Sequence, residues 1–86
     1  MARLEFYVQW NIYDDNGGIL EIGEGVEASY NGVVIEGVID ELFCMADEEV
    51  GYIKIEPYGD VSLEVNAMFD EMLDVEDFDY IRKISY

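Results

Sequence analysis

The side chains that offer this sequence the most chemistry are carboxylates, and they gather in two stretches. Residues 36–49 and residues 70–79 each contain six acidic residues and no basic residue. The second stretch also holds four apolar residues, which we expect to turn inward and to leave the carboxylates in an ordered outward row. The candidate partner-binding residues are Glu36, Asp40, Glu41, Asp47, Glu48, Glu49, Asp70, Glu71, Asp74, Glu76, Asp77 and Asp79.

Enzymatic chemistry finds little support in the residue types. The chain has no histidine, which excludes histidine-based triads and the common zinc sites within it. Its single cysteine, Cys44, lies among acidic residues, which favour the neutral thiol over the nucleophilic thiolate. With 21 acidic residues, close carboxylate pairs are expected by chance. We therefore predict no catalytic residue, no cofactor and no enzymatic activity.

One segment partly resembles a calcium-binding loop. Asp14, Asn16 and Gly18 have the spacing of its first three odd-numbered positions. Ile19 occupies the position that requires glycine, and no glutamate closes the loop. We expect no specific metal site here, and instead a diffuse attraction of divalent cations by the acidic surface.

The net charge indicates the kind of partner. The chain carries 21 acidic and 4 basic residues, a formal charge of −17. Nucleic acid and anionic membranes are themselves negative, so direct binding to either is disfavoured and basic proteins are expected instead. Because 51% of the residues are hydrophobic, the acids should lie on a folded protein and not on a disordered chain. The length of 86 residues predicts a single domain over residues 1–86.

Signals for export or membrane insertion are weak. Glu5 and Gln9 interrupt the apolar run near the N-terminus, which is unlike a signal peptide. No apolar run approaches the length of a membrane span, and one cysteine cannot form an internal disulfide. We expect a complete, cytoplasmic chain.

Alternating residues predict two strands in the N-terminal third. Between residues 3 and 13, every even-numbered residue is apolar: Leu4, Phe6, Val8, Trp10 and Ile12. This period of two predicts one long strand with a face on the core, and its length predicts a central position in a sheet. A turn over residues 14–18 should lead to a second strand, whose inner residues are Leu20, Ile22, Val26 and Ala28.

Residues 31–46 allow two interpretations. Asn31-Gly32 is a favoured two-residue hairpin turn, but Asn31 is also a good helix N-cap. Read as a helix, the segment gathers its acids on one side, which favours the helix. Gly37 weakens such a helix by about 1 kcal/mol relative to alanine. The predicted apolar side contains Val34, Ile35, Val38, Ile39, Leu42, Met45 and Ala46.

The C-terminal half predicts a hairpin, a helix and a last strand. Residues 52–56 and 61–65 alternate around a turn, and their expected inward residues are Ile53, Ile55, Val61, Leu63 and Val65. Asn66 should cap a short helix anchored by Met72 and Leu73, and Phe78 should begin a strand that runs to the C-terminus. The predicted α+β fold is an antiparallel or mixed five-stranded sheet with two helices on one face, in the order ββαββαβ.

The two acidic stretches resemble those of small, often phage-encoded proteins that imitate nucleic acid and so inhibit CRISPR effectors or restriction enzymes. The resemblance is to a functional class, rests on the twelve candidate residues and includes no diagnostic motif. It implies a protein that occupies the DNA- or RNA-binding channel of a basic protein. Carboxylates one helical turn apart repeat at roughly the spacing of phosphates, so a groove rich in arginine and lysine should accept them. Exposed tyrosines would add contact area, with Tyr7, Tyr13, Tyr52 and Tyr58 as candidates.

Two other functions fit the same composition. An immunity protein that caps a basic nuclease toxin needs the same negative surface. A structural or assembly protein needs the charge for solubility alone. The leading expectation is an inhibitor of a basic nucleic-acid-binding protein or nuclease.

Overall fold

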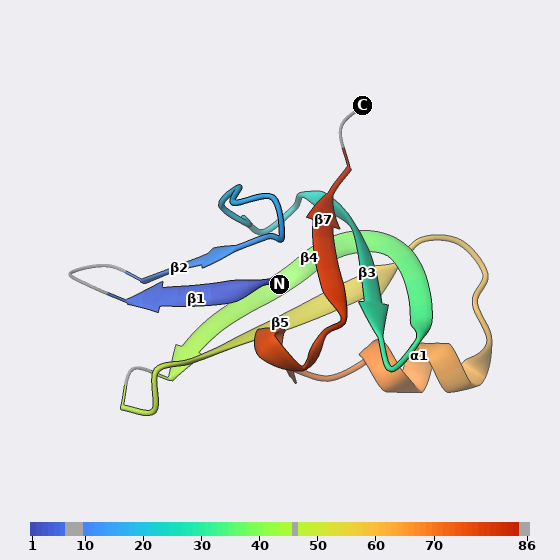
Figure 1. The fold of residues 1–86 in the computed structure, drawn as a ribbon. Coiled ribbons are helices and arrows are strands. Elements are labelled where there is room, and N and C mark those ends of the chain that lie inside the picture. The colour runs from blue at the N-terminus through green and yellow to red at the C-terminus, as the bar shows by residue number, and fades with distance from the viewer. Residues whose placement is uncertain (7–9, 46, 85–86) are drawn as a thin grey trace.

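The computed structural model describes residues 1–6, 10–45 and 47–84. In this part of the chain it contains seven strands, one α-helix and one 3-10 helix (Figure 1). The elements are β1 (Arg3–Phe6), β2 (Trp10–Tyr13), β3 (Gly25–Tyr30), β4 (Val33–Met45), β5 (Val50–Pro57), α1 (Leu63–Phe69), β6 (Leu73–Asp74), η1 (Val75–Asp77) and β7 (Tyr80–Lys83).

The strands form two antiparallel sheets. The larger sheet has the order β6-β5-β4-β3-β7, and β1 pairs with β2 in a separate sheet. The five-stranded antiparallel sheet of the predicted α+β fold is therefore confirmed. The predicted order ββαββαβ is wrong, because the first predicted strand is the β1–β2 hairpin of the separate sheet and the first predicted helix is β4. The described residues therefore contain one α-helix where two were expected.

The predicted long strand over residues 3–13 is a hairpin and not a central strand. Leu4 stands opposite Ile12 in the register of β1 and β2, and residues 7–9 lie outside the described part of the chain. Because Leu4 and Ile12 are both even-numbered, the alternation continues through the hairpin without a break. Ile12 is buried and packs against Gly51 of β5. A Cβ atom added to Gly51 would lie 3.2 Å from the Cδ1 atom of Ile12. The hairpin thus packs on the inner face of the large sheet.

Residues 14–30 follow the prediction in part. The turn forms at residues 14–18, but β3 begins only at Gly25. Before it, Gly23 has a positive φ of 93°, and the neighbouring Ile22 is 64% exposed where a core position was expected. The other predicted inner residues are buried: Leu20, Val26 and Ala28.

Residues 31–45 form a hairpin turn and a strand, so the predicted helix is wrong. Asn31 and Gly32 have positive φ values of 50° and 79°, as in the two-residue turn that Asn-Gly favours. β4 pairs with β3 along its first half and with β5 along its second half. The β-branched residues of its first half suit a paired strand better than a helix. Ala46, the last residue of the predicted helix, lies outside the described residues.

A bulge at Asp40 explains why β4 has the periodicity of a helix. The register with β5 shifts between Ile39 and Glu41. Before the shift the inward residues are odd-numbered and include Ile35 and Ile39, whereas Leu42 continues the inner face after it. The step of three residues from Ile39 to Leu42 has the spacing of a helix face.

The α-helix begins earlier than predicted. Ser62 is its N-cap and accepts a hydrogen bond from the Val65 N–H at 3.2 Å, so Asn66 lies inside the helix. Residues 61–65 were predicted as a strand, but residues 63–65 begin α1, and Leu63 is 87% exposed where an inward position was expected. The buried residue of α1 is Phe69. No helix in the described residues is long and apolar enough to span a membrane.

The acidic stretch 70–79 connects the two edges of the large sheet. β6 pairs with β5 at one edge, η1 follows, and β7 pairs with β3 at the other edge. The predicted helix and linker are thus a short strand and a 3-10 helix. The prediction that the apolar residues turn inward is confirmed for Leu73, Val75 and Phe78, all of which are buried.

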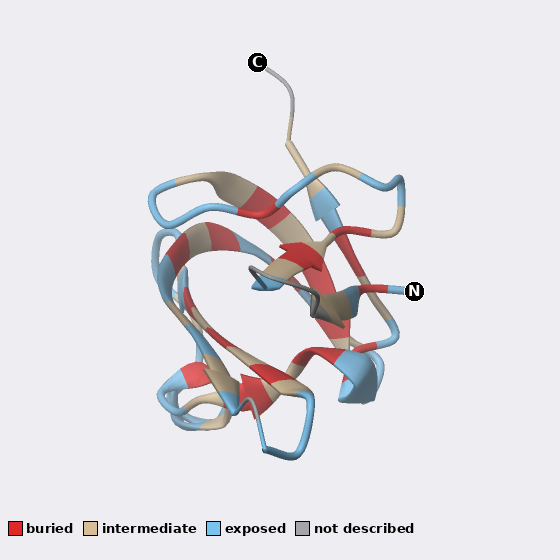
Figure 2. Ribbon diagram, turned by 90° about the vertical axis from the view of Figure 1, so that its left-hand side faces the viewer, coloured by how far each residue is buried: buried red, intermediate tan, exposed pale blue. Residues whose placement is uncertain are grey.

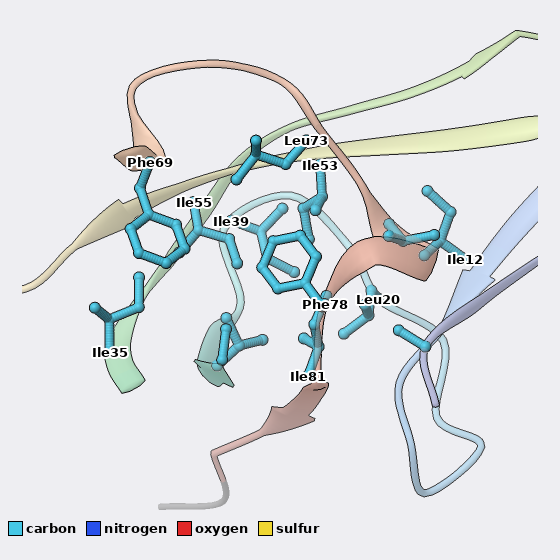
Figure 3. Close-up of a cluster of buried hydrophobic side chains, with 14 residues drawn as sticks. Ile12, Leu20, Ile35, Ile39, Ile53, Ile55, Phe69, Leu73, Phe78 and Ile81 are labelled. Atoms are coloured by element: carbon cyan, nitrogen blue, oxygen red, sulfur yellow. The ribbon is translucent and has the colours of Figure 1, made fainter. Parts of the chain in front are cut away.

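The core lies between the large sheet and the segments that cross its inner face. It joins Ile39, Ile53 and Ile55 of the sheet to Phe69 and Phe78 from either end of the acidic stretch (Figure 3). Buried and exposed residues alternate along the strands (Figure 2). The inward positions of Ile53 and Ile55 on β5 were predicted from this alternation and are confirmed.

Two carboxylates of the turn after β2 hold the small sheet to the large one. Asp14 is 2% exposed and accepts hydrogen bonds from the N–H groups of Gly18 at 2.7 Å and Lys83 at 3.1 Å. Asp15 accepts one from the Ile81 N–H at 2.6 Å. These side chains satisfy backbone groups on the edge of β7 that faces away from β3. The residue that begins the partial calcium motif, Asp14, therefore serves the fold.

Candidate protein-binding surface

The first acidic cluster is spread along β4. Glu36 lies in the first half of the strand, Asp40 and Glu41 lie at the bulge, and residues 47–49 form the turn to β5. A strand rises about 3.3 Å per residue, and β4 is 13 residues long. It curves along the sheet and spreads its acids over this length (Figure 1). These acids form a line and not the compact helix face that the sequence predicted.

The second acidic cluster follows the edge strand β6 and the crossing segment. Asp70 caps the C-terminal end of α1, and Glu71 follows it on the surface. Asp74 ends β6, and η1 contains Glu76 and Asp77, which are both exposed. The sixth member, Asp79, precedes β7 and is described below.

Lys54 brings the two clusters together. Its Nζ atom lies 3.8 Å from Asp40 and 3.9 Å from Asp70, which belong to different clusters. In the β4–β5 register it stands opposite Glu41. These contacts border a pocket of about 270 Å³, to which Glu56 also contributes. One basic residue thus sits among several carboxylates at the meeting point of the clusters.

The remaining basic side chains pair with acids outside the candidate set. Their closest carboxylate contacts are 3.4 Å from Arg3 to Glu5, 3.7 Å from Arg82 to Glu27 and 3.2 Å from Lys83 to Glu24. Within the described residues, Asp40 and Asp70 are the candidate acids that form ion pairs. In the part of the chain that the structure describes, the other members of both clusters form no ion pair.

Two of the candidate acids form hydrogen bonds that stabilise the fold. Asp79 accepts hydrogen bonds from the Gly32 N–H and the Ser29 hydroxyl, both at 2.9 Å. The Gly32 N–H, and after it the Ser29 hydroxyl, lowers the pKa of the Asp79 carboxyl from its usual value. Asp74 accepts a hydrogen bond from the Glu76 N–H at 2.9 Å and so caps η1. Both side chains are less available to a partner than their sequence neighbours.

The second half of β4 and the first half of β5 carry an apolar centre on their outer face. We call residues 41–45 and 50–54 the arm. Phe43 is 52% exposed, and its ring centroid lies 6.4 Å from that of Tyr52 on the neighbouring strand. Met45 follows on the same face and is 42% exposed. The arm face consists of Glu41, Phe43 and Met45 of β4 and of Val50, Tyr52 and Lys54 of β5, with Asp74 of β6 opposite Tyr52.

Sequence reasoning missed Phe43 and placed Met45 inside the protein. Both errors follow from reading β4 as a helix, which hides the alternation of Glu41, Phe43 and Met45. Of the tyrosines expected on the surface, Tyr58 is exposed, whereas Tyr13 and Tyr52 are partly buried, Tyr52 beside Phe43. Tyr7 lies outside the described residues.

The arm face has the composition of a protein–protein interface. Protein interfaces combine an apolar, often aromatic centre with a polar rim, and the arm face has both. The side chain of Cys44 lies on the opposite face of β4, and Gly51 is its register partner on β5. Because residues 33–45 form a strand, the acidic neighbours that Cys44 would have had on the predicted helix do not surround it in the described structure. No three histidine, cysteine, aspartate or glutamate residues in the described part of the chain are grouped as a cation site.

Comparisons of the chain with models of protein families, with curated proteins and with solved structures found no match.

Proposed function

We propose that this protein is an acidic inhibitor that binds a basic nucleic-acid-processing protein and blocks its DNA or RNA site by charge mimicry. The observation that carries the proposal is that most carboxylates of the two clusters form no ion pair among the described residues and lie next to the aromatic centre of the arm face. Like the phage-encoded inhibitors that the sequence resembles, it would act in the cytoplasm of the cell that contains its target.

The physical basis is the similarity of carboxylates and phosphates as ligands. Both present only acceptor oxygens, and arginine binds either in a bidentate manner. The helical spacing expected from the sequence does not apply to β4, where outward residues on one strand face recur about every 6.6 Å. Rows of this kind from β4, the β4–β5 turn and the β6–η1 segment would offer a basic groove several binding points at once.

The aromatic centre argues for a specific protein surface over diffuse attraction. Phe43 and Tyr52 would supply buried contact area, and a charged rim would speed encounter and set the salt dependence. The same observation supports the second candidate function, an immunity protein that caps a basic nuclease toxin. The two functions differ in the target, which is a CRISPR effector or restriction enzyme for the inhibitor and a nuclease toxin for the immunity protein.

A competition assay tests the proposal. A guide-loaded CRISPR effector, a restriction endonuclease and a basic nuclease toxin would each be loaded with a fluorescent oligonucleotide and titrated with the protein. Displacement from one of them is expected, and it should weaken steeply as salt rises. Displacement from the toxin alone would favour the immunity protein. Full retention of the oligonucleotide by all three, or displacement that ignores salt, would contradict charge mimicry.

A matched pair of variants locates the contact. Asp47→Asn with Glu48→Gln removes two charges from the β4–β5 turn, and Asp60→Asn with Glu64→Gln removes the same two side-chain types elsewhere on the exposed surface. The first pair should slow association and weaken displacement, because rim charges act chiefly on the association rate. Equal effects of both pairs would show that net charge alone is responsible.

A further inference from the structure

A groove separates the β1–β2 hairpin from the free side of the arm. It has a volume of about 390 Å³, which is within the range of ligand-binding sites. Figure 1 shows the end of β1, the end of β4 and the start of β5 on the same side of the molecule. The apolar lining of the groove consists of Trp10, Ile12, Ile19, Leu20, Ile22 and Leu42.

β4 has an open edge beside this groove. Its ladder with β3 ends at Val38, after which the Ile39 N–H donates to Glu24 and the Gly23 N–H donates to Ile39, both at 2.9 Å. Within the described structure, residues 41–45 pair with β5 alone. An unpaired edge is a template on which another strand can form.

The strand register shows which backbone groups face the groove. Ile39 directs its N–H and C=O away from β5 and stands opposite Ile55. Leu42 stands opposite Ile53, which lies two residues from Ile55 on β5. In a strand, every second residue points its N–H and C=O groups to the same side, so Leu42 has the same orientation relative to β5 as Ile39. Leu42, and by the same alternation Cys44, therefore direct their N–H and C=O groups toward the groove. Their side chains lie on the inner face.

The surroundings define the chemistry of an added strand. Its inward side chains would meet the apolar lining around Trp10 and Ile22. Its outward side chains would lie beside Glu41 and Phe43, where a basic residue forms a favourable cross-strand pair. Among the described residues the groove is lined by one charged residue, Glu21, which is acidic. A second copy of the chain is a poor occupant, because each copy carries a charge of −17.

We propose that the groove binds an extended segment of a basic partner, which adds as an antiparallel strand to the open edge of β4. Its alternate apolar residues lie beside Trp10, and its basic residues lie on the arm face. The inference deepens the proposed function, on which it rests for the positive charge of the partner.

Peptides with blocked backbone groups test this mode of binding. The probe is a peptide of alternating valine and lysine in three forms: unmodified, N-methylated at every valine, and N-methylated at every lysine. Trp10 is the single tryptophan and is 37% exposed, so its fluorescence reports on the groove. Valine N–H groups would face Leu42 and Cys44, so valine methylation should weaken binding at least about tenfold by removing backbone hydrogen bonds. The lysine-methylated peptide should bind like the unmodified one.

Equal binding of the two methylated peptides would overturn strand addition, because charge attraction does not depend on which N–H is blocked. Ile22→Ser removes an exposed lining residue, and Leu63→Ser is its control at an 87% exposed position on α1. The first variant should lose peptide affinity and the second should keep it. A dimer of the free protein that Ile22→Ser dissociates would overturn the proposal in favour of a second copy. These measurements use no nucleic-acid-processing protein, so their failure is distinguishable from failure of the competition assay.

Discussion

The Asp79 carboxylate accepts a hydrogen bond from the Ser29 hydroxyl at 2.9 Å, and the two residues are 50 positions apart in the chain. The same oxygen accepts the Gly32 N–H, so the segment before β7 is fastened to the β3–β4 hairpin. A residue that looks like one more surface acid is therefore part of the tertiary structure. Acids in the same stretch can thus be separated into those that hold the fold and those that are free to bind.

Asp79→Ala should lower the thermal unfolding midpoint at neutral pH more than Asp77→Ala, which removes an equal charge from an exposed position. The pKa of Asp79 is lowered in the fold, so its contribution is present above the unfolded value near 3.8 and is lost as the pH falls through the folded value. Thermal melts between pH 7 and strongly acidic pH would show the gap between wild type and Asp79→Ala closing in acid. A gap that widened below pH 4 would contradict this linkage.

Gly37→Ala distinguishes the strand from the helix by the sign of its effect. In the strand, a Cβ at Gly37 would collide with the Glu56 carbonyl oxygen and approach Ile55 Cγ2 at 2.8 Å. Such overpacking should destabilise the protein by about 1–3 kcal/mol. In a helix the same change would be stabilising by up to about 1 kcal/mol. Chemical denaturation measures the difference, with Gly18→Ala, whose Cβ has contacts of 3.4 Å or more, as the control.

Asp14→Ala should destabilise the junction between the two sheets. The buried carboxylate accepts hydrogen bonds from the N–H groups of Asn16, Gly18 and Lys83, which would be left without it. Loss of a buried acceptor of this kind costs about 1–3 kcal/mol. Hydrogen exchange should show faster exchange at the amides of Gly18 and Lys83. Unchanged exchange there, or an equal loss of stability in the exposed control Asp60→Ala, would contradict the assigned role.

Phe43→Ala should weaken partner binding and leave the fold intact. Aromatic residues at the centre of an interface contribute more than about 1 kcal/mol when truncated, or roughly fivefold or more in affinity. Val34→Ala is the control, because Val34 lies on the same strand and is similarly exposed, 55% against 52%. The competition assay measures both variants. If Val34→Ala were the weaker inhibitor, the contact would lie at the other end of β4.

Lys54→Gln should make inhibition more dependent on salt. Lys54 compensates Asp40 and Asp70 at 3.8 and 3.9 Å, and its removal frees both carboxylates for a basic partner. The loss of two partly exposed ion pairs should cost only about 0.2–1 kcal/mol each in stability. Displacement measured over a range of salt concentrations should become stronger at low salt. Weaker displacement at low salt would mean that Lys54 itself contacts the partner.

The segment that forms β4 was wrongly predicted to be a helix. Its inward residues change from odd to even numbering at the Asp40 bulge, which produces the three-residue step of a helix between Ile39 and Leu42. The local signal for the correct answer was the Asn31-Gly32 turn. Periodicity alone could not choose, because the bulge exists only where β4 pairs with β5.

The small sheet shows a second limit of periodicity. Leu4 and Ile12 have the same parity, so a hairpin and a single long strand produce one alternating pattern. The pattern correctly places Ile12 on the core face, where it is buried, but it also places Trp10 there, and Trp10 is 37% exposed. It does not indicate where the chain reverses or which strand lies beside it.

Residue types and their spacing predicted the burial of Leu73, Val75 and Phe78 in the acidic stretch, the inward faces of Ile53 and Ile55, and the large negative charge. These properties depend on residue type and on spacing within one element. Three contacts could be found only in the folded protein: Phe43 with Tyr52 on an exposed face, Lys54 with both acidic clusters, and Asp79 with Ser29. Each of these relations joins residues from different elements, and strand pairing and burial of the shared core bring those elements together.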